Sequence, residues 1–182
     1  GFRTNLTEKE YKINVEKIGL AMIGQTERVA PADKKMYALR DVTATVDNLD
    51  LITASILSKK ISVGSKYILI DIPYGKSAKV SKKQAVKLKH KFLEIGKKFG
   101  LKLEVVLTDG SEPIGNGIGP VLEMQDIIKV FKRNSPPKDL EEKSIMLAGI
   151  IFELSGKAKK GEGNEIARQI LESGQAFKKF KE

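Results

Sequence analysis

The sequence predicts an α/β fold in which helices flank a parallel sheet. Two short apolar runs with β-branched residues, 67–72 and 101–107, have the length and composition of strands. Between them, 81–98 has the spacing of a long amphipathic helix. Strands joined through a helix pair in parallel, and such sheets are usually covered on both faces. The three segments therefore predict a βαβ unit.

Before this unit, the sequence predicts one strand and one helix. The strand is expected at 17–23, in another short apolar run. The helix is expected from Leu51, with basic residues near its end and Gly64 as its stop signal. In the 81–98 helix, the stripe facing the core is expected to comprise Ala85, Leu88, Phe92 and Ile95.

After the unit, the pattern becomes helical. A turn-rich segment with four glycines, 109–119, leads into a helix expected at about 120–133. Two consecutive prolines, Pro136 and Pro137, end that element. Further helices are expected near 140–154 and 164–173.

Composition restricts the classes of function. The chain has 182 residues, of which 41% are hydrophobic, so it can form one sizeable core or one domain with part of another. It has no cysteine, which excludes disulfides and thiolate metal sites. No apolar run approaches the roughly 20 residues of a membrane span, so we expect a cytoplasmic protein with no membrane partner. A net charge of +10 favours anionic ligands such as phosphate and nucleotides.

The same charge raises the alternative of a non-catalytic basic module that binds nucleic acid or another protein. The densest basic segment lies on the 81–98 helix and comprises Lys82, Lys83, Lys87, Lys89, Lys91, Lys97 and Lys98. These lysines surround the apolar stripe, have few aromatic neighbours and form no known binding module. We therefore interpret them, and the single histidine His90, as solvent-exposed and do not expect a nucleic-acid partner.

One segment, 37–60, combines residue types that suit a ligand site. Ser55 and Lys59 are four positions apart, so they share one helix face and could hold one planar polar ligand. Arg40 precedes them, and its rigid fork of donors suits a carbonyl-rich heterocycle or an anion. The competing interpretation is a capped, salt-bridged surface helix.

The words in and around this segment resemble a known family. YALRDVTATVD followed by ITASILSKK resembles the base-binding signature of thymidine and pyrimidine-nucleoside phosphorylases, and GQT at 24–26 and APAD at 30–33 match that family too. DGSEPIG at 109–115 and GPVLE at 119–123 continue the match. The resemblance implies a phosphate-binding α/β domain formed by 1–31 and 63–182, and a segment, 32–62, of a separate helical domain that carries the base site.

The resemblance also implies roles for particular residues. Arg40, Ser55 and Lys59 would bind the base, and Arg40 and Lys59 would neutralise the charge that grows on it as the glycosidic bond breaks. In related archaeal AMP phosphorylases, the position of Asp47 is the proton donor and Ser55 contacts the nucleotide. Asp47 would need a raised pKa for that role.

The sequence is compatible with two types of substrate, a pyrimidine nucleoside and AMP. At 71–79 the sequence DIPYGKSAK is similar to the loop of AMP phosphorylases, in which the lysine at position 79 binds the nucleotide. The base signature is instead of the pyrimidine type. The parent enzyme is therefore expected to cleave a pyrimidine nucleoside such as thymidine with phosphate, or else AMP.

The resemblance further suggests a potassium ion, held by the backbone carbonyls of Ile114 and Gly117 and by Asp126. The family usually has glutamate at that last position, so a plain helix-entry turn is the competing interpretation. No other cofactor is expected beside phosphate as co-substrate.

We also expect the chain to be an internal piece of a longer, homodimeric enzyme. The family's phosphate-cradling Lys-His-Ser/Thr-Thr-Gly-Gly loop does not occur in it. Alone, the piece is expected to be inactive and to self-associate through an exposed patch comprising Leu51, Ile52, Ile56 and Leu57.

Overall fold

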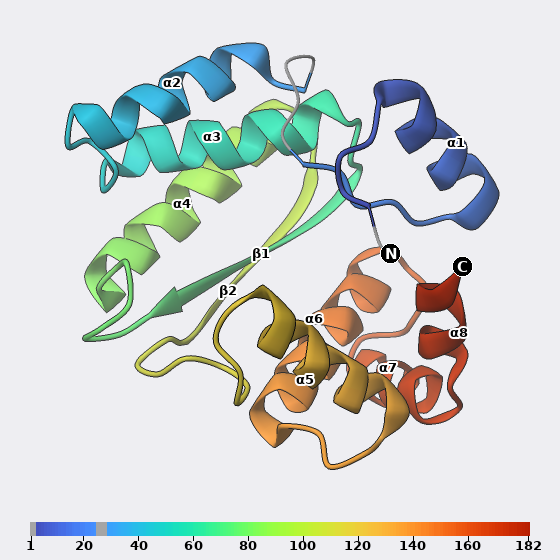
Figure 1. Cartoon of the computed structure of the whole chain (residues 1–182). Helices are drawn as coiled ribbons and strands as arrows, with labels where there is room; N and C mark the ends of the chain where they lie inside the picture. The colour runs from blue at the N-terminus through green and yellow to red at the C-terminus, as the bar shows by residue number, and fades with distance from the viewer. Residues whose placement is uncertain (1–2, 25–28) are drawn as a thin grey trace. The chain divides into compact units, whose positions relative to one another are not determined.

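The computed structural model describes residues 3–24 and 29–182, which form two compact units, one ending at Ser65 and the other comprising Lys66–Lys181 (Figure 1). GQT at 24–26 extends beyond the described residues at Gln25 and Thr26. Within the described part of the chain, no helix is long and apolar enough to cross a membrane.

The first unit begins with a helix where a strand was predicted. Helix α1, Glu8–Ile18, starts at a capping box in which the Thr7 hydroxyl accepts from the Glu10 amide and the Glu10 carboxylate accepts from the Thr7 amide. It ends at Gly19, whose φ of 79° is left-handed. The strand predicted at 17–23 is therefore wrong. Lys17 and Ile18 complete α1, and residues 20–23 form no strand.

Two further helices complete this unit. Helix α2, Pro31–Val42, lies in the segment 32–62 that the resemblance assigned to a helical domain, and it packs against α3, Leu49–Ser62. Helix α3 begins two residues before the predicted start, because the Asn48 side chain caps it by accepting from the amides of Asp50 and Leu51.

The apolar patch predicted on α3 is not exposed. Leu57 is 2% exposed, and the other three members are half-buried. The prediction failed because it treated α3 as a helix without neighbours. Apolar side chains with greater exposure lie on α2, where Leu39 is 58% and Val42 is 80% exposed.

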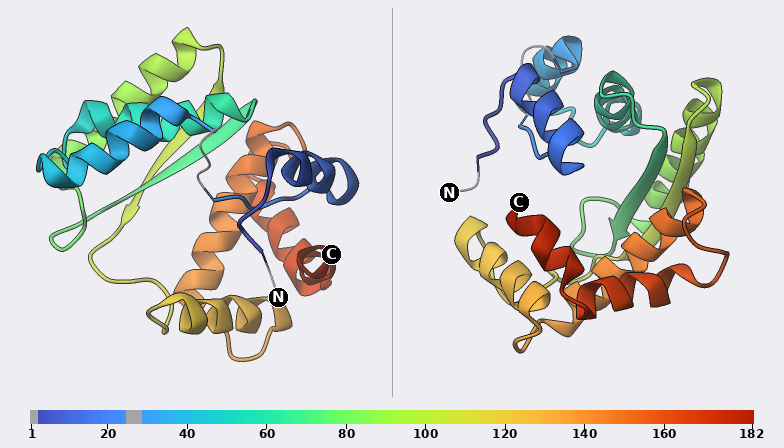
Figure 2. Two further views of the ribbon diagram at one scale, coloured as in Figure 1. Left: turned by 45° about the horizontal axis from the view of Figure 1, so that its top comes forward. Right: turned by 90° about the vertical axis from the view of Figure 1, so that its right-hand side faces the viewer.

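The second unit contains the predicted βαβ arrangement. Strands β1, Tyr67–Tyr74, and β2, Lys102–Asp109, pair in parallel from Tyr67↔Lys102 to Tyr74↔Asp109. Helix α4, Lys82–Lys98, connects them and starts at a capping box of Ser81 and Gln84. It packs on both strands, as Figure 2 also shows.

Burial of this sheet alternates along its strands. Ile68, Ile70, Ile72 and Val105 are buried on one face, and three residues of the predicted α4 stripe, Ala85, Leu88 and Phe92, are buried as well. Residues of the other face, such as Leu69 and Val106, are half-buried, and α6 contacts β1. The sheet is therefore most completely covered on one face.

The predicted C-terminal helices are confirmed. They are α5, Pro120–Lys132; α6, Lys138–Leu154; and α7, Gly163–Glu172. A short helix that was not predicted, α8, Gln175–Lys181, follows them. Their shared core comprises Val130, Ile145, Ala167 and Leu171. Helices α6 and α7 approach closely at Gly149, where an added Cβ would lie 2.6 Å from the backbone nitrogen of Asn164.

Candidate functional site

Helices α2 and α3 bring together the residues that the sequence singled out in the first unit. The ammonium Nζ of Lys59 lies 2.7 Å from Oδ2 of Asp33 and donates to Oγ of Ser55 at 2.9 Å. Asp33 is 7% and Ser55 5% exposed, so the ammonium group is fixed by two nearly buried partners. Asp33 belongs to the APAD word, but sequence reasoning gave it no role.

An aromatic ring lies beside two cations of this group. The Tyr37 ring centroid is 5.4 Å from Cζ of Arg40 and 5.5 Å from Nζ of Lys59, which are cation–π distances. We call Asp33, Tyr37, Arg40, Ser55 and Lys59 the α2–α3 cluster. Its two cations, one hydroxyl and one ring are groups that could hold a planar ligand carrying carbonyl oxygens or negative charge.

Arg40 is the most constrained cation of the cluster. It is 5% exposed, and its Nη2 donates to the carbonyl of Val46. Among the residues that the structure describes, its Nε has no hydrogen-bond partner. A buried donor without a partner costs free energy, about 1–3 kcal/mol, and a bound acceptor would remove that cost.

Asp47 lies next to the residue that Arg40 contacts, in the turn between α2 and α3. It is exposed. Its role as proton donor stays a prediction.

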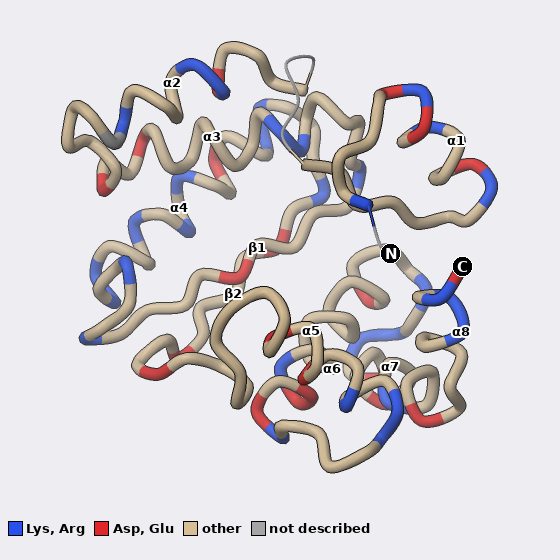
Figure 3. The backbone as a smooth tube through the Cα atoms, in the orientation of Figure 1, with Lys and Arg blue, Asp and Glu red and all other residues tan. Residues whose placement is uncertain are grey.

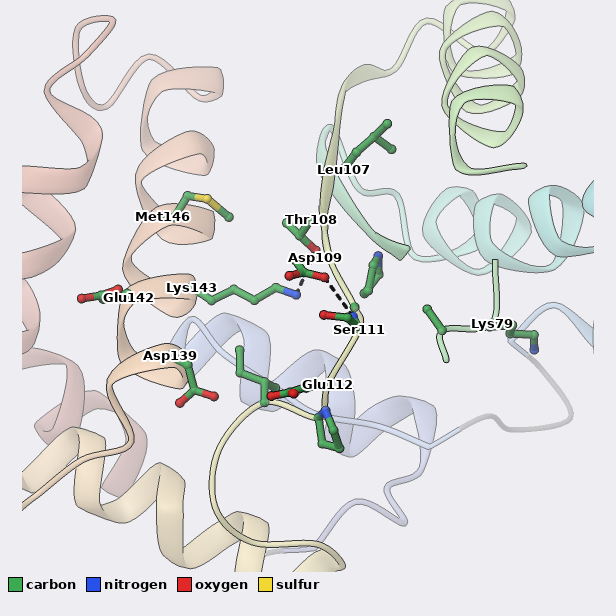
Figure 4. A pocket seen from close by; sticks show the side chains of 15 residues that line it. Lys79, Leu107, Thr108, Asp109, Ser111, Glu112, Asp139, Glu142, Lys143 and Met146 are labelled. Atoms are coloured by element: carbon green, nitrogen blue, oxygen red, sulfur yellow. Dashed lines mark hydrogen bonds between the residues drawn. The ribbon is translucent and has the colours of Figure 1, made fainter. Parts of the chain in front are cut away.

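The second unit has a pocket of about 880 Å³ at the carboxyl ends of β1 and β2. The loop after β1 contributes Lys79, the loop after β2 contributes residues 109–114, and α6 contributes Lys143 (Figure 4). The carboxyl ends of parallel strands are where open α/β sheets bind ligands. Lys79, expected to bind a nucleotide, is exposed and lines this pocket.

Two glycines let the loops on either side of this pocket touch backbone to backbone. A Cβ on Gly75 would lie 2.8 Å from the amide nitrogen of Ser111, and one on Gly110 would lie 2.8 Å from Cβ of Pro73. The Gly110 amide donates to the Tyr74 carbonyl at 2.9 Å. The position of the Lys79 loop therefore depends on the loop after β2.

A polar network at the pocket wall was missed by sequence reasoning. Nζ of Lys143 lies 2.7 Å from Oδ2 of Asp71 and donates to Oγ1 of Thr108 at 3.1 Å. The Thr108 hydroxyl donates to Oδ1 of Asp71 at 2.7 Å. Asp71 begins the word DIPYGKSAK, but nothing in the sequence connects it with a lysine in a distant helix.

One of the proposed potassium ligands, the Asp126 carboxylate, already has hydrogen-bond and ion-pair partners in the protein. Oδ2 of Asp126 accepts from the amides of Asn116 and Gly117 at 2.8 and 2.7 Å, and Oδ1 lies 2.9 Å from Nζ of Lys129. The Lys129 ammonium, together with these amides, holds the pKa of the Asp126 carboxyl below its usual range. Backbone amides that donate to a helix carboxylate in this way are consistent with a plain turn at the entry to α5. A potassium ion on the carbonyls of Ile114 and Gly117 would have to share the carboxylate with Lys129, and it stays a prediction.

Helix α4 carries further basic residues. Lysines recur along α4, as Figure 3 shows, and His90 is exposed on the same helix. Within the described residues, no three histidine, cysteine, aspartate or glutamate side chains are grouped so that they could hold a metal ion.

Comparison with known proteins gives matches along almost the whole chain. The family described as "Glycosyl transferase family, a/b domain" matches residues 1–177. An AMP phosphorylase from Pyrococcus furiosus is 44% identical over 179 residues, which are 97% of this chain and 35% of that protein. A protein from Methylococcus capsulatus named "Putative thymidine phosphorylase" is 45% identical over 160 residues, 86% of this chain and 31% of that protein. The chain thus spans about a third of the length of these relatives.

Proposed function

This chain belongs to the glycosyl transferase family, a/b domain, and from that premise we propose that it forms part of a nucleoside phosphorylase. Below, the complete enzyme means the longer polypeptide that we propose contains it. The names of the relatives at 44–45% identity support this class of activity. The proposal includes a cytoplasmic homodimer, and the exposed apolar side chains of α2 would suit such an association.

The observation that carries the proposal is the α2–α3 cluster. In phosphorolysis, a phosphate oxygen forms a bond to the anomeric carbon of the sugar, the carbon–nitrogen bond to the base breaks, and its electron pair leaves with the base. Arg40 and Lys59 are fixed cations that would stabilise this developing negative charge. The Ser55 hydroxyl would orient the base edge, and Asp47 would donate a proton to the departing base.

We assign the base site to residues 32–62, as part of a helical domain, and the remainder to the α/β domain. In the complete enzyme, closure of the two domains would bring base and phosphate together. The isolated 182-residue chain is then expected to release no base, because the family's phosphate-cradling loop does not occur in its sequence.

For the substrate, we favour a nucleoside monophosphate, which would yield free base and ribose 1,5-bisphosphate. Lys79 lines the pocket at the strand ends, where it would meet a 5′-phosphate, and several of the relatives are named AMP phosphorylases. The second candidate is a pyrimidine nucleoside such as thymidine, which would yield a pentose 1-phosphate. The name of the Methylococcus relative favours it.

Parallel assays with the complete enzyme test both candidates. Phosphate-dependent release of base is measured from AMP, thymidine and uridine at equal concentrations. We expect AMP to give the highest kcat/KM. A higher value for thymidine would favour the second candidate. If base is released from none of them and the protein binds arbitrary DNA in a salt-sensitive way through the α4 lysines, the alternative of a non-catalytic basic binding module is favoured.

A further inference from the structure

A half-buried ion pair between Asp71 and Lys143 lies at the strand-end pocket, where Lys143 is a lining residue, and the proposed function gives the pair no role. Asp71 is on β1, Thr108 on β2 and Lys143 on α6, and each contacts the other two. The side chains of Asp71 and Lys143 are 18% and 21% exposed. We call these three residues the wall network. Figure 4 shows Lys143 reaching from α6 toward Thr108.

The charges around this pocket are unfavourable for an anion. Four acidic residues line it, against two lysines: Asp109, Glu112, Asp139 and Glu142 against Lys79 and Lys143. Backbone amides donate to two of these carboxylates. Asp109 accepts from the Ser111 amide, which lowers its pKa, and Asp139 accepts from the amides of Gly115 and Leu140. An additional uncompensated carboxylate at the wall would repel a phosphate group strongly.

Asp71 would be that additional carboxylate if Lys143 did not neutralise it. Like charges in a partly buried site interact through a low effective dielectric constant, so the repulsion would extend across a pocket of this size. Lys79 is exposed and can move, whereas Lys143 is held in place by two partners. A preorganised charge contributes more to recognition than a mobile one.

We propose that Lys143 determines specificity for a phosphorylated substrate, because it neutralises Asp71 and so allows an anionic 5′-phosphate to bind beside Lys79. The proposal rests on the proposed function. Lys143 acts through Asp71 and is therefore a positioning residue. A neutral nucleoside has no charge for Asp71 to repel, so its binding should depend much less on this ion pair.

The test compares AMP with adenosine, which differ only in the phosphate group. In the complete enzyme, Lys143→Met should raise KM for AMP on the order of tenfold, with a change for adenosine of less than about twofold. The inhibition constant replaces KM for a compound that is not turned over. Lys143→Arg should preserve the value for AMP. Lys138→Met, on the same helix but outside the pocket lining, is the matched control.

A second variant separates charge from folding. Asp71→Asn combined with Lys143→Met removes both charges, and the KM for AMP should return to within about threefold of the original value. Thermal unfolding of each variant checks that it is folded. The proposal is overturned if Lys143→Met changes AMP and adenosine equally, or if the double variant binds AMP as poorly as the single one.

The failure of the proposed function would look different. In that case the unmodified enzyme would cleave no nucleoside or nucleotide. The ion pair is then tested by calorimetric binding of AMP and adenosine to the unmodified protein and the same four variants. The same selective loss for AMP supports the role of Lys143, and equal affinities for AMP and adenosine in the unmodified protein overturn it.

Discussion

The Asp33 carboxylate and the Lys59 ammonium lie 2.7 Å apart, joining the start of α2 to the end of α3. Asp33 is nearly buried, so solvent screens its attraction for the ammonium group less than it would at an exposed pair. The same ammonium contacts Ser55 and faces the Tyr37 ring. The arrangement therefore fixes a cation beside a hydroxyl and an aromatic surface before any ligand is bound.

Asp33→Asn should lower phosphorolysis by the complete enzyme roughly tenfold to a hundredfold, because Lys59 would lose the partner that positions it. Steady-state rates measure the effect, and it should appear mainly in kcat. Asp50→Asn changes an exposed carboxylate in the first turn of α3 and should leave the rate close to its original value. Equal rates for the Asp33 and Asp50 variants would show that Lys59 needs no anchor.

Lys59→Ala and Arg40→Ala should each lower kcat/KM by about 10²- to 10³-fold. Loss of one preorganised cation next to a developing anion typically costs about 3–4 kcal/mol of transition-state stabilisation. Lys60→Ala removes an exposed neighbouring lysine and serves as the control. A variant of Arg40 or Lys59 that keeps near-normal turnover would remove that residue from the site.

Lys79→Ala should impair turnover of AMP far more than that of thymidine or uridine, since only AMP carries a 5′-phosphate. The matched control is Lys76→Ala, in the same loop but outside the pocket lining. The ratio of kcat/KM between AMP and uridine is the measurement. If Lys79→Ala lowers kcat/KM for AMP and for uridine by the same factor, the lysine does not recognise the 5′-phosphate.

Local sequence patterns were sufficient for much of the second unit. Strands β1 and β2 and helix α4 each carry their own periodicity, and Ser55 and Lys59 share a helix face through their spacing alone. The failures are of two kinds. A capping box at Thr7 and Glu10 starts α1 among polar residues, and the helix continues to Ile18, inside the run that was interpreted as a strand. The pairs Asp33–Lys59 and Asp71–Lys143 join separate elements, and their contact depends on packing that no local pattern encodes.

Gly149→Ala should reduce the free energy of unfolding by about 3 kcal/mol, at the upper end for overpacking, because the added Cβ would meet the backbone of Asn164. Gly156→Ala is the comparison. That glycine has open space around it but a left-handed φ of 74°, so alanine should cost only about 1 kcal/mol. Urea unfolding of the 182-residue chain measures both. A larger loss at Gly156 would contradict the close contact of α6 with α7.

The Asp126 carboxyl gives a prediction about acid stability and about potassium. Its pKa is lowered in the folded protein, so its contribution to stability is present above the ordinary aspartate pKa of about 3.9 and is lost as the pH falls through the lowered value. Asp126→Asn should therefore reduce stability at pH 7 and flatten the dependence on pH below about 4. Unfolding curves between pH 2 and 7 measure this.

Lys129 would compete with a potassium ion, because its ammonium lies where the ion would contact Asp126. If the carbonyls of Ile114 and Gly117 bind potassium with this carboxylate, replacing NaCl by KCl at constant ionic strength should raise the unfolding temperature. Lys129→Met should then increase the potassium effect, because the competing ammonium is gone. Lys132→Met, an exposed lysine on the same helix, is the control. The absence of a potassium-specific shift in both the unmodified chain and the Lys129 variant would contradict the potassium site and leave Asp126 as the anchor of a helix-entry turn.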